Sequence, residues 1–173
     1  MSEKIKEYPG ERIKTADLRA GLVPLIKYKP EAKYAWSAGI AMSRFLNELK
    51  NGRILASVCK KCNRIVVPPR VFCEMCFKPI DGYTYVKDTG KVNTYSISYI
   101  AADASRVKEP TIVAVIELDG ASPGIVILHV LGEVKPEEVK FGMRVKAVWK
   151  PPEQREGAIT DIKYFKPIGE GEM

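Results

Sequence analysis

Residues 59–76 read CKKCNRIVVPPRVFCEMC and contain all four cysteines of the 173-residue chain. Two residues separate the cysteines within each pair, and ten residues separate the pairs. This spacing lets both sulfurs of a pair reach one ion while the backbone N–H groups of the turn point at the thiolates. The pattern predicts a tetrahedral metal site, with zinc as the expected ion, on Cys59, Cys62, Cys73 and Cys76.

The segment between the two pairs, NRIVVPPRVF, is long enough for a strand, a turn and a return strand. Four thiolates fill a tetrahedral shell and leave no position for a catalytic water, so the predicted site is structural. The metal then replaces the hydrophobic core that so small a ribbon lacks. Asn63 follows the first pair and tolerates the left-handed backbone that the exit of such a turn requires. Phe77 follows the second pair, where small residues are more usual, and predicts a wider turn.

Three other uses of these cysteines stay open at this point. Iron binds the same four-sulfur cage, because geometry alone does not separate it from zinc. A disulfide pair is the second alternative, although closely spaced pairs in a chain without a secretory signal favour metal binding. A redox dithiol is the third, and it is weaker because neither pair opens a helix within a βαβ unit.

The composition is that of a folded globular chain with an excess of positive charge. The chain is 46% hydrophobic and 28% charged, and its formal net charge is +7. No apolar run approaches the ~20 residues of a membrane-spanning helix. The charged start, MSEKIKEYPGERIK, lacks the apolar region of a secretory signal, so we expect a cytoplasmic protein. The positive charge fits either a lysine-rich surface or an anionic partner, meaning nucleic acid or a phosphorylated small molecule.

Changes in pattern along the chain predict three domains. They are an N-terminal helical segment over residues 1–52, a zinc ribbon over 53–82 and a β domain over 83–173. Within the first, a long helix is expected over 30–52 and a shorter one over 15–28.

The longer predicted helix has Pro30 in its first turn and Gly52 at its end, positions that both residues favour. Apolar residues recur along it at three- and four-residue spacing, which indicates one buried stripe. The stripe is expected to pack either on the chain's own barrel or on a partner enzyme. It comprises Ala35, Ala38, Met42, Phe45 and Leu49.

Five runs rich in β-branched residues predict the strands of the β domain. They span residues 91–101, 111–118, 124–131, 144–150 and 158–166. The third connection, which contains KPEEV, allows one helical turn. Five short strands with such a connection predict a closed barrel of the OB type, and a five-stranded sandwich fragment is the competing architecture. Gly90 in KDTGKV is interpreted as a turn residue.

The sequence indicates that the protein is not an enzyme. Its only histidine, His129, lies in the apolar run GIVILHVL and is interpreted as a core or interface residue rather than as a base. No cysteine remains for a thiol nucleophile once four bind a metal. The GxSxG, HExxH and P-loop motifs are absent from the sequence.

Several segments occur in one order that resembles a known two-domain family. They are WSAG (36–39), GRILASVCKKC (52–62), VPPRVFCEMC (67–76), DTGKV (88–92), FGMRV (141–145) and EGAITDIKYF (156–165). Together they resemble, over roughly residues 34–168, the zinc-ribbon/OB-fold family catalogued as domain of unknown function thirty-five. The resemblance implies a rubredoxin-like zinc ribbon packed on an OB barrel, preceded by long N-terminal helices.

The same resemblance implies a role beside acyl-CoA enzymes. Members of the family partner thiolases or related aldolases, and an archaeal member looks like the bridge between acetoacetyl-CoA thiolase and hydroxymethylglutaryl-CoA synthase in the mevalonate route. We therefore expect a non-catalytic scaffold that binds such enzymes and helps to hold or channel acyl-CoA. The expected partner interface is the helix stripe at Met42, Phe45 and Leu49.

Basic residues near the ribbon and the barrel mouth are the candidates for contact with coenzyme A phosphates. They are Arg70, Arg106, Lys108, Lys150 and Arg155. For each of them, an ordinary surface charge or a carboxylate partner is the alternative. The alternative function is nucleic-acid binding, since zinc ribbons and OB folds both serve it. The second and third predicted strands, however, contain no aromatic residue, whereas OB nucleic-acid faces stack bases on central strands. The aromatic residues cluster in the first and last predicted strands as Tyr95, Tyr99, Tyr164 and Phe165.

Overall fold

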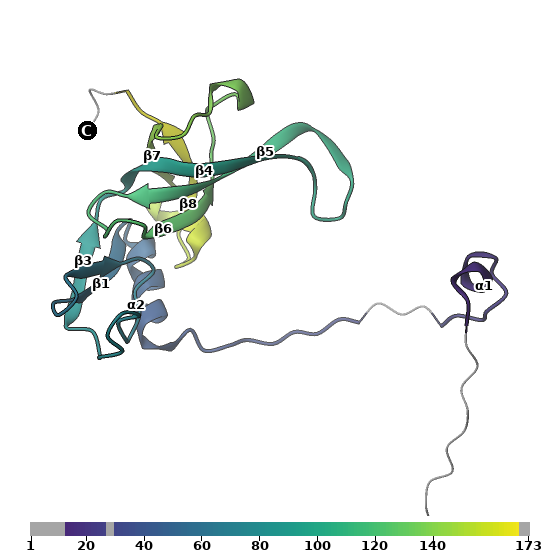
Figure 1. The fold of residues 1–173 in the computed structure, drawn as a ribbon, viewed down its shortest axis with the longest axis horizontal. Coiled ribbons are helices and arrows are strands. Elements are labelled where there is room, and N and C mark those ends of the chain that lie inside the picture. Colours follow the sequence, from purple (N-terminus) through teal and green to yellow (C-terminus); the bar gives the residue numbers. More distant parts are fainter. Residues whose placement is uncertain (1–12, 27–29, 170–173) are drawn as a thin grey trace, which may run out of the picture. The chain divides into compact units, whose positions relative to one another are not determined.

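The computed structural model describes residues 13–26 and 30–169 (Figure 1). Residues from Ser37 onward form one compact unit, and the preceding residues belong to a second unit. The second unit contains helix α1, Thr15–Arg19, which is shorter than the helix expected over 15–28. Gly21 has a φ of +70°, so the right-handed helix stops before it. Residues 27 and 28 of the expected helix lie outside the described residues.

Helix α2 spans Gly39–Lys50 and starts later than predicted. Residues 30–38 are all exposed and non-helical, so Pro30 does not begin the helix, and Ala35 and Ala38 lie outside it. Without a surface to cover, an apolar stripe alone does not stabilise a helix in water. The predicted end is confirmed, because Gly52 follows the helix with a φ of +73°.

The ribbon is a three-stranded antiparallel sheet in the order β2-β1-β3. Its strands are β1 (Ile54–Cys59), β2 (Arg64–Val66) and β3 (Gly82–Val86). Strand β1 occupies the centre and is almost completely buried, because α2 packs against it. The two loops that carry the cysteines lie at the end of this sheet.

The β domain is a five-stranded antiparallel sheet in the order β6-β5-β4-β7-β8. Its strands are β4 (Thr89–Ile100), β5 (Arg106–Leu118), β6 (Val126–Val130), β7 (Arg144–Trp149) and β8 (Ile162–Pro167). A parallel bridge between Leu131 and Phe165 joins the two outer strands. The sheet therefore closes into the predicted OB barrel, and the sandwich alternative is wrong.

Three short 3₁₀ turns lie between the barrel strands. Pro136–Glu138 forms the helical turn that the third connection predicted. Pro152–Gln154 follows β7, and Ile159–Asp161 immediately precedes β8. This last turn explains why β8 begins at Ile162 and not at residue 158, since residues 158–161 curl around the Asp161 carboxylate.

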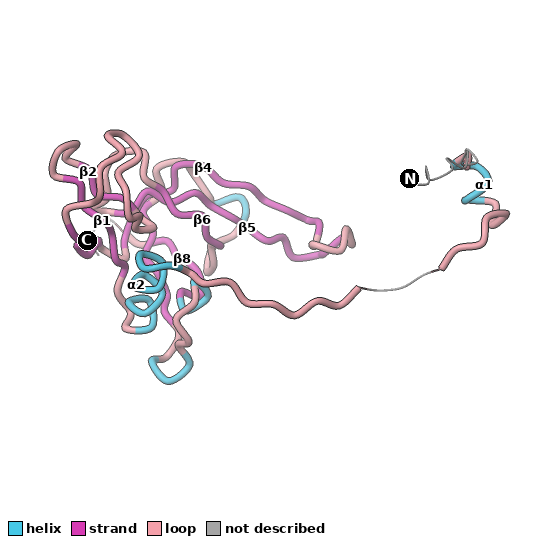
Figure 2. The backbone as a smooth tube through the Cα atoms, turned by 90° about the horizontal axis from the view of Figure 1, so that it is seen from below, coloured by secondary structure: helices cyan, strands magenta, loops and turns pink. Residues whose placement is uncertain are grey.

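The β4–β5 hairpin is longer than predicted and reaches beyond the rest of the barrel (Figure 2). Strand β5 begins at Arg106, which pairs with Ile100, whereas the sequence predicted a loop up to residue 110. The ladder is irregular between Ser98 and Ile100. Polar and proline residues obscure the strand pattern here, because this end of the hairpin covers no core.

One hydrophobic core joins α2, the ribbon and the barrel. Phe45 and Leu49 from α2 belong to the same buried cluster as Ile54 of β1 and Ile116 and Phe165 of the barrel. The fold class, mainly β with an N-terminal helix, a ribbon and an OB barrel, is confirmed, while the domain boundaries at 52/53 and 82/83 stay a prediction. Among the described residues, no helix is long and apolar enough to cross a membrane.

Candidate metal centre and binding surfaces

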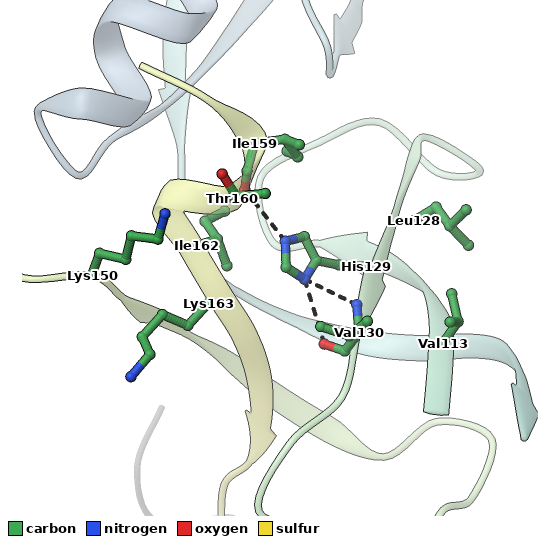
Figure 3. Close-up of a pocket in the computed structure, with 9 residues that line it drawn as sticks. All are labelled: Val113, Leu128, His129, Val130, Lys150, Ile159, Thr160, Ile162 and Lys163. Atoms are coloured by element: carbon green, nitrogen blue, oxygen red, sulfur yellow. Dashed lines mark hydrogen bonds between the residues drawn. The ribbon is translucent and has the colours of Figure 1, made fainter. Parts of the chain in front are cut away.

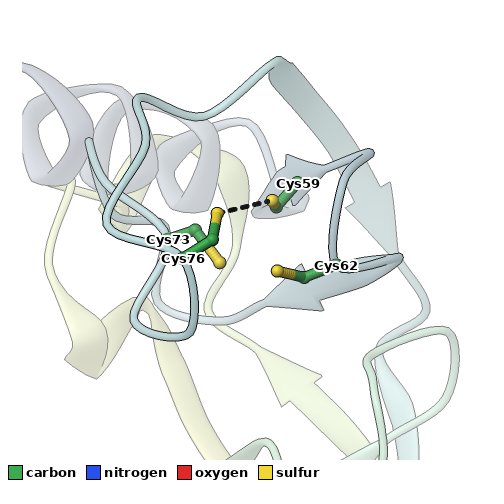
Figure 4. Close-up of side chains that lie close together, drawn as sticks. All are labelled: Cys59, Cys62, Cys73 and Cys76. Carbon is green, nitrogen blue, oxygen red and sulfur yellow. Dashed lines mark hydrogen bonds between the residues drawn. The ribbon is translucent and has the colours of Figure 1, made fainter.

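The four cysteine sulfurs converge at the end of the ribbon (Figure 4). All four Sγ atoms lie within 4.8 Å of one another, and those of Cys59 and Cys76 are 3.8 Å apart. A tetrahedral zinc site with Zn–S bonds of ~2.3 Å has sulfurs about 3.8 Å apart. A disulfide needs a bond of ~2.05 Å, and all four thiols are free. The cysteines are therefore positioned to bind a metal.

Two backbone turns, each ending in a residue with left-handed backbone, present the sulfurs. Asn63 has a φ of 49°, and its N–H donates to the Lys60 carbonyl at 3.3 Å, so the predicted left-handed exit is confirmed. Phe77 has a φ of 55°, and its N–H donates to the Cys73 carbonyl at 2.9 Å. The hydrogen bond of the second turn joins residues four apart and that of the first joins residues three apart, so the second turn is the wider one, as predicted. The Phe77 ring is 81% exposed, and a side chain pointing into solvent meets no clash there.

The thiols differ in acidity because their surroundings differ. Backbone N–H groups of Cys76 and Met75 lower the pKa of the Cys73 thiol to about 7. Hydrogen bonding to the Cys76 sulfur, together with burial, raises the pKa of Cys62 to about 12. Four thiols this close together do not all lose their protons without a cation, because the negative charges of the thiolates repel one another. A divalent ion fits the site, because it would neutralise the thiolates that it binds.

Polar contacts outside the sulfurs fix the two cysteine loops. The Lys60 N–H donates to Asp81 Oδ2 at 2.7 Å, and the Arg64 guanidinium lies 2.9 Å from the Glu74 carboxylate. The N–H of Arg70 donates to the buried Ser57 hydroxyl at 3.1 Å. These contacts hold the loops that carry Cys62 and Cys73 in position around the site.

Known families match the ribbon and the barrel separately. Residues 46–80 match the rubredoxin-like zinc ribbon domain of ChsH2, and residues 83–150 match the C-terminal OB-fold domain of ChsH2. A DUF35 domain-containing scaffold protein of Methanocaldococcus jannaschii is 33% identical over 114 residues, which cover 64% of this chain and 78% of the relative. The chain belongs to the DUF35 family.

Other DUF35 proteins extend the comparison. A DUF35 domain-containing scaffold protein of Pyrococcus furiosus is 28% identical over 119 residues, which cover 67% of this chain and 84% of the relative. A solved DUF35 structure from Sulfolobus solfataricus has a TM-score of 0.55 at 33% identity, covering 64% of this chain and 78% of that one. The Ltp2-ChsH2(DUF35) aldolase structure has a TM-score of 0.54 at 20% identity, covering 78% and 98%, and shows the shared fold.

The predicted partner interface on this DUF35 chain needs a correction. Phe45 and Leu49 are 1% and 0% exposed and belong to the core, and Met42 is half-buried against it. Phe45 and Leu49 therefore lie too far inside the protein to contact a partner surface. Through these residues α2 packs against the ribbon and the barrel of the same chain, which was the alternative to a partner interface.

The five candidate coenzyme A residues do not form one cluster. Arg70 is exposed on the ribbon, and Arg106 and Lys108 are exposed on strand β5 rather than in a loop. The Arg155 guanidinium lies 5.5 Å from the Trp149 ring centroid, and its Nε donates to the Lys150 carbonyl at 2.7 Å. Arg155 is therefore already bound within the chain. Lys150 lines a surface groove.

That groove, of about 580 Å³, lies between β6 and the start of β8 (Figure 3). Val113, Leu128, Ile159 and Ile162 supply apolar lining, and Lys150 and Lys163 supply positive charge. None of the lining residues is acidic.

His129 points across the groove, as the close-up shows (Figure 3). Its Nδ1 accepts the Val130 N–H at 3.0 Å, and its Nε2 lies 3.4 Å from the Ile159 carbonyl, to which it donates as the Nε2–H tautomer. The ring also contacts Phe165 edge-on. These contacts agree with the interpretation of His129 as a core or interface residue.

Most of the groove was not predicted from the sequence. Leu128 lies in the apolar run GIVILHVL, yet its side chain is 65% exposed. The reason is topological: β6 is an outer strand of the sheet, and sequence pattern does not reveal strand order. The sequence around residues 159–163 indicated only a β-strand and gave no indication of a groove.

Proposed function

We propose that this DUF35 chain is a non-catalytic scaffold subunit that binds thiolase-type acyl-CoA enzymes. The observation that carries the proposal is the exposed apolar character of the segment before α2. Large apolar and aromatic side chains recur there with high exposure: Leu22 74%, Ile26 95%, Tyr34 75% and Trp36 84%. Extensive exposed apolar surface marks sites of interaction with other proteins. Relatives with 33% and 28% identity are named scaffold proteins, which supports the same conclusion.

The proposed partners are acetoacetyl-CoA thiolase and hydroxymethylglutaryl-CoA synthase or related thiolase-fold enzymes. A DUF35 chain is named together with Ltp2 in the aldolase structure, which supports partnering with an enzyme. Because acetoacetyl-CoA formation is uphill, a second enzyme held close by benefits from a high effective concentration of its substrate. Acyl-CoA contact through Arg70, Arg106, Lys108 or Lys150 stays part of this proposal.

We propose zinc as the ion of the cysteine site and a structural role for it. The matched rubredoxin-like zinc ribbon and the 3.8 Å spacing of sulfurs support this assignment. Cys59, Cys62, Cys73 and Cys76 would hold the ion, and its bonds would fix the two loops that the small ribbon sheet cannot stabilise alone. All four ligands come from the protein, so the ion would offer no open position for substrate.

Sedimentation velocity of the purified chain with the thiolase and synthase of the same organism tests the scaffold function. We expect one complex that contains all three proteins and no turnover by this chain alone. The double variant Tyr34→Ala/Trp36→Ala should weaken the complex, because their rings contact each other edge-on and are otherwise exposed. The variant Lys33→Ala is the matched control. If the native chain sediments apart from both enzymes, the proposed partners are wrong.

A further inference from the structure

The groove between β6 and β8 contains an unpaired strand edge. The Leu131 N–H donates to the Ile112 carbonyl of β5 at 2.9 Å, so odd-numbered residues of β6 direct their backbone groups to β5. In an antiparallel ladder, the even-numbered residues then direct their backbone N–H and C=O groups away from β5, to the outer edge of β6. The N–H of Val130 points to this outer edge and donates to Nδ1 of the His129 ring at 3.0 Å. The backbone groups of Val126 and Leu128 also face this outer edge.

The outer edge of β6 is open along Val126 and Leu128. In the described residues the one backbone bridge between the β6 and β8 sides of the barrel is Leu131–Phe165, and the groove lies beside it. Within the described part of the chain, no residue forms a backbone hydrogen bond with Leu128 from the groove side. A free strand edge of this kind accepts another extended chain.

Side chains on both faces of β6 border the opening. Leu128 and Val113 lie on one face of the β5–β6 pair, while His129 lies on the other, nearer Ile159 and Ile162. An added strand has side chains that alternate between two faces. Apolar residues of an added strand would therefore find apolar contacts on each side of β6.

The charge of the groove selects among the possible occupants. Lys150 and Lys163 line it, whereas the carboxylate of neighbouring Asp161 is buried and accepts N–H groups of residues 156–158. A second copy of this chain would be repelled, because it would bring its own lysines against this pair and each chain carries a net charge of +7. The chain's own segment 13–38 has five basic and two acidic residues, so it is also repelled. An acidic occupant fits.

We propose that this groove binds an extended, acidic and apolar peptide segment of a partner protein by strand addition to β6. The segment forms backbone hydrogen bonds with Val126 and Leu128, places apolar side chains against Leu128 and Ile159, and places a carboxylate near Lys150 and Lys163. The proposal rests on the proposed scaffold function, to which it adds a docking surface on the barrel, separate from the N-terminal segment.

Selection from a phage-displayed library of random eight-residue peptides on the full-length chain tests the proposal. We expect enriched peptides that alternate apolar residues with Asp or Glu. The best peptide, made synthetically, should bind the Lys150→Glu/Lys163→Glu variant at least tenfold more weakly. A version N-methylated on its backbone should also lose binding. In NMR titrations, the Val126 and Leu128 amides should shift on binding.

A second variant, Leu128→Lys, keeps the test decisive if the double variant does not fold, since this side chain is already 65% exposed. The proposal is overturned if no peptide is enriched, if enriched peptides are basic, or if they bind native and variant chains equally. It is also overturned if decanoate, but no peptide, shifts the groove amides, because a small amphiphile is then the occupant. Failure here leaves the sedimentation result with the enzymes unaffected, so the two proposals are tested separately.

Discussion

Arg144 on β7 forms a two-point ion pair with Asp119, which directly follows β5. Its Nη1 lies 2.9 Å from Oδ1 and its Nη2 lies 2.5 Å from Oδ2. The Thr89 hydroxyl at the start of β4 donates to the same carboxylate. Three neighbouring strand ends of the barrel are therefore joined by one acidic side chain beside the ribbon strand β3.

This ion pair predicts how stability depends on pH. Hydrogen bonds from Arg144 and then Thr89 outweigh burial and lower the pKa of Asp119 from 3.8 to about 2. Since the folded pKa is the lower one, the stabilisation is present above about pH 4 and is lost as the pH falls toward 2. Because the carboxylate is 28% exposed, we expect a contribution of about 1–2 kcal/mol.

Urea unfolding at pH 5 and pH 3 measures this contribution. The native chain should lose more free energy of unfolding between the two pH values than Asp119→Asn, which has no carboxylate to protonate. Identical losses in both proteins would show that the ion pair contributes nothing measurable.

Metal removal should unfold the ribbon. Structural zinc contributes apparent binding free energy on the order of 10 kcal/mol in small metal domains. We expect Cys62→Ser to reduce the bound zinc measured by elemental analysis and to lower the Tm, because the ribbon shares its core with α2 and the barrel. Met75→Ala, between two ligands but 64% exposed, is the control and should keep one zinc per chain. A native preparation without metal would refute the assignment.

Asp161 organises the loop that forms one wall of the groove. Its fully buried carboxylate accepts the N–H groups of Glu156, Gly157 and Ala158. Burial raises its pKa, but these three donors outweigh burial and the pKa is lowered overall. Asp161→Ala leaves the donors without a partner, so we expect a loss of about 3 kcal/mol in the free energy of unfolding.

The neighbouring variant Thr160→Ala is the control for Asp161→Ala in the same urea titration. Thr160 is exposed, so its loss should change stability by less than about 0.5 kcal/mol. Equal effects of the two substitutions would show that the loop does not depend on the carboxylate.

The sequence predicted those parts of the fold that depend on residue spacing. The cysteine spacing placed four sulfurs together, and the five β-branched runs predicted the barrel strands. It failed where a contact between distant residues decides the structure. The apolar stripe suggested a helix from Pro30, but only its part that reaches the core at Phe45 and Leu49 is helical. The openness of β6 at Leu128 depends on strand order, which local pattern does not contain.

Gly90 shows the same limit at a single residue. It was interpreted as a turn glycine, yet it lies in strand β4 opposite Leu118. A Cβ built on Gly90 would lie 2.4 Å from the Glu117 carbonyl oxygen and 3.0 Å from a methyl of Ile116. The absence of a side chain therefore allows β4 and β5 to approach closely, and nothing in KDTGKV itself reveals the strand on the other side.

Gly90→Ala should destabilise the barrel, because backbone and not a flexible side chain occupies the space that the methyl group needs. Overpacking of this kind costs about 1–3 kcal/mol. Gly82→Ala is a matched control in ribbon strand β3, where an added Cβ meets no atom within 4 Å. There the substitution should be neutral or slightly stabilising, since alanine restricts the unfolded chain. Parallel urea titrations of the zinc-loaded proteins compare the two. Equal stability of both variants would show that β4 and β5 separate without cost at Gly90.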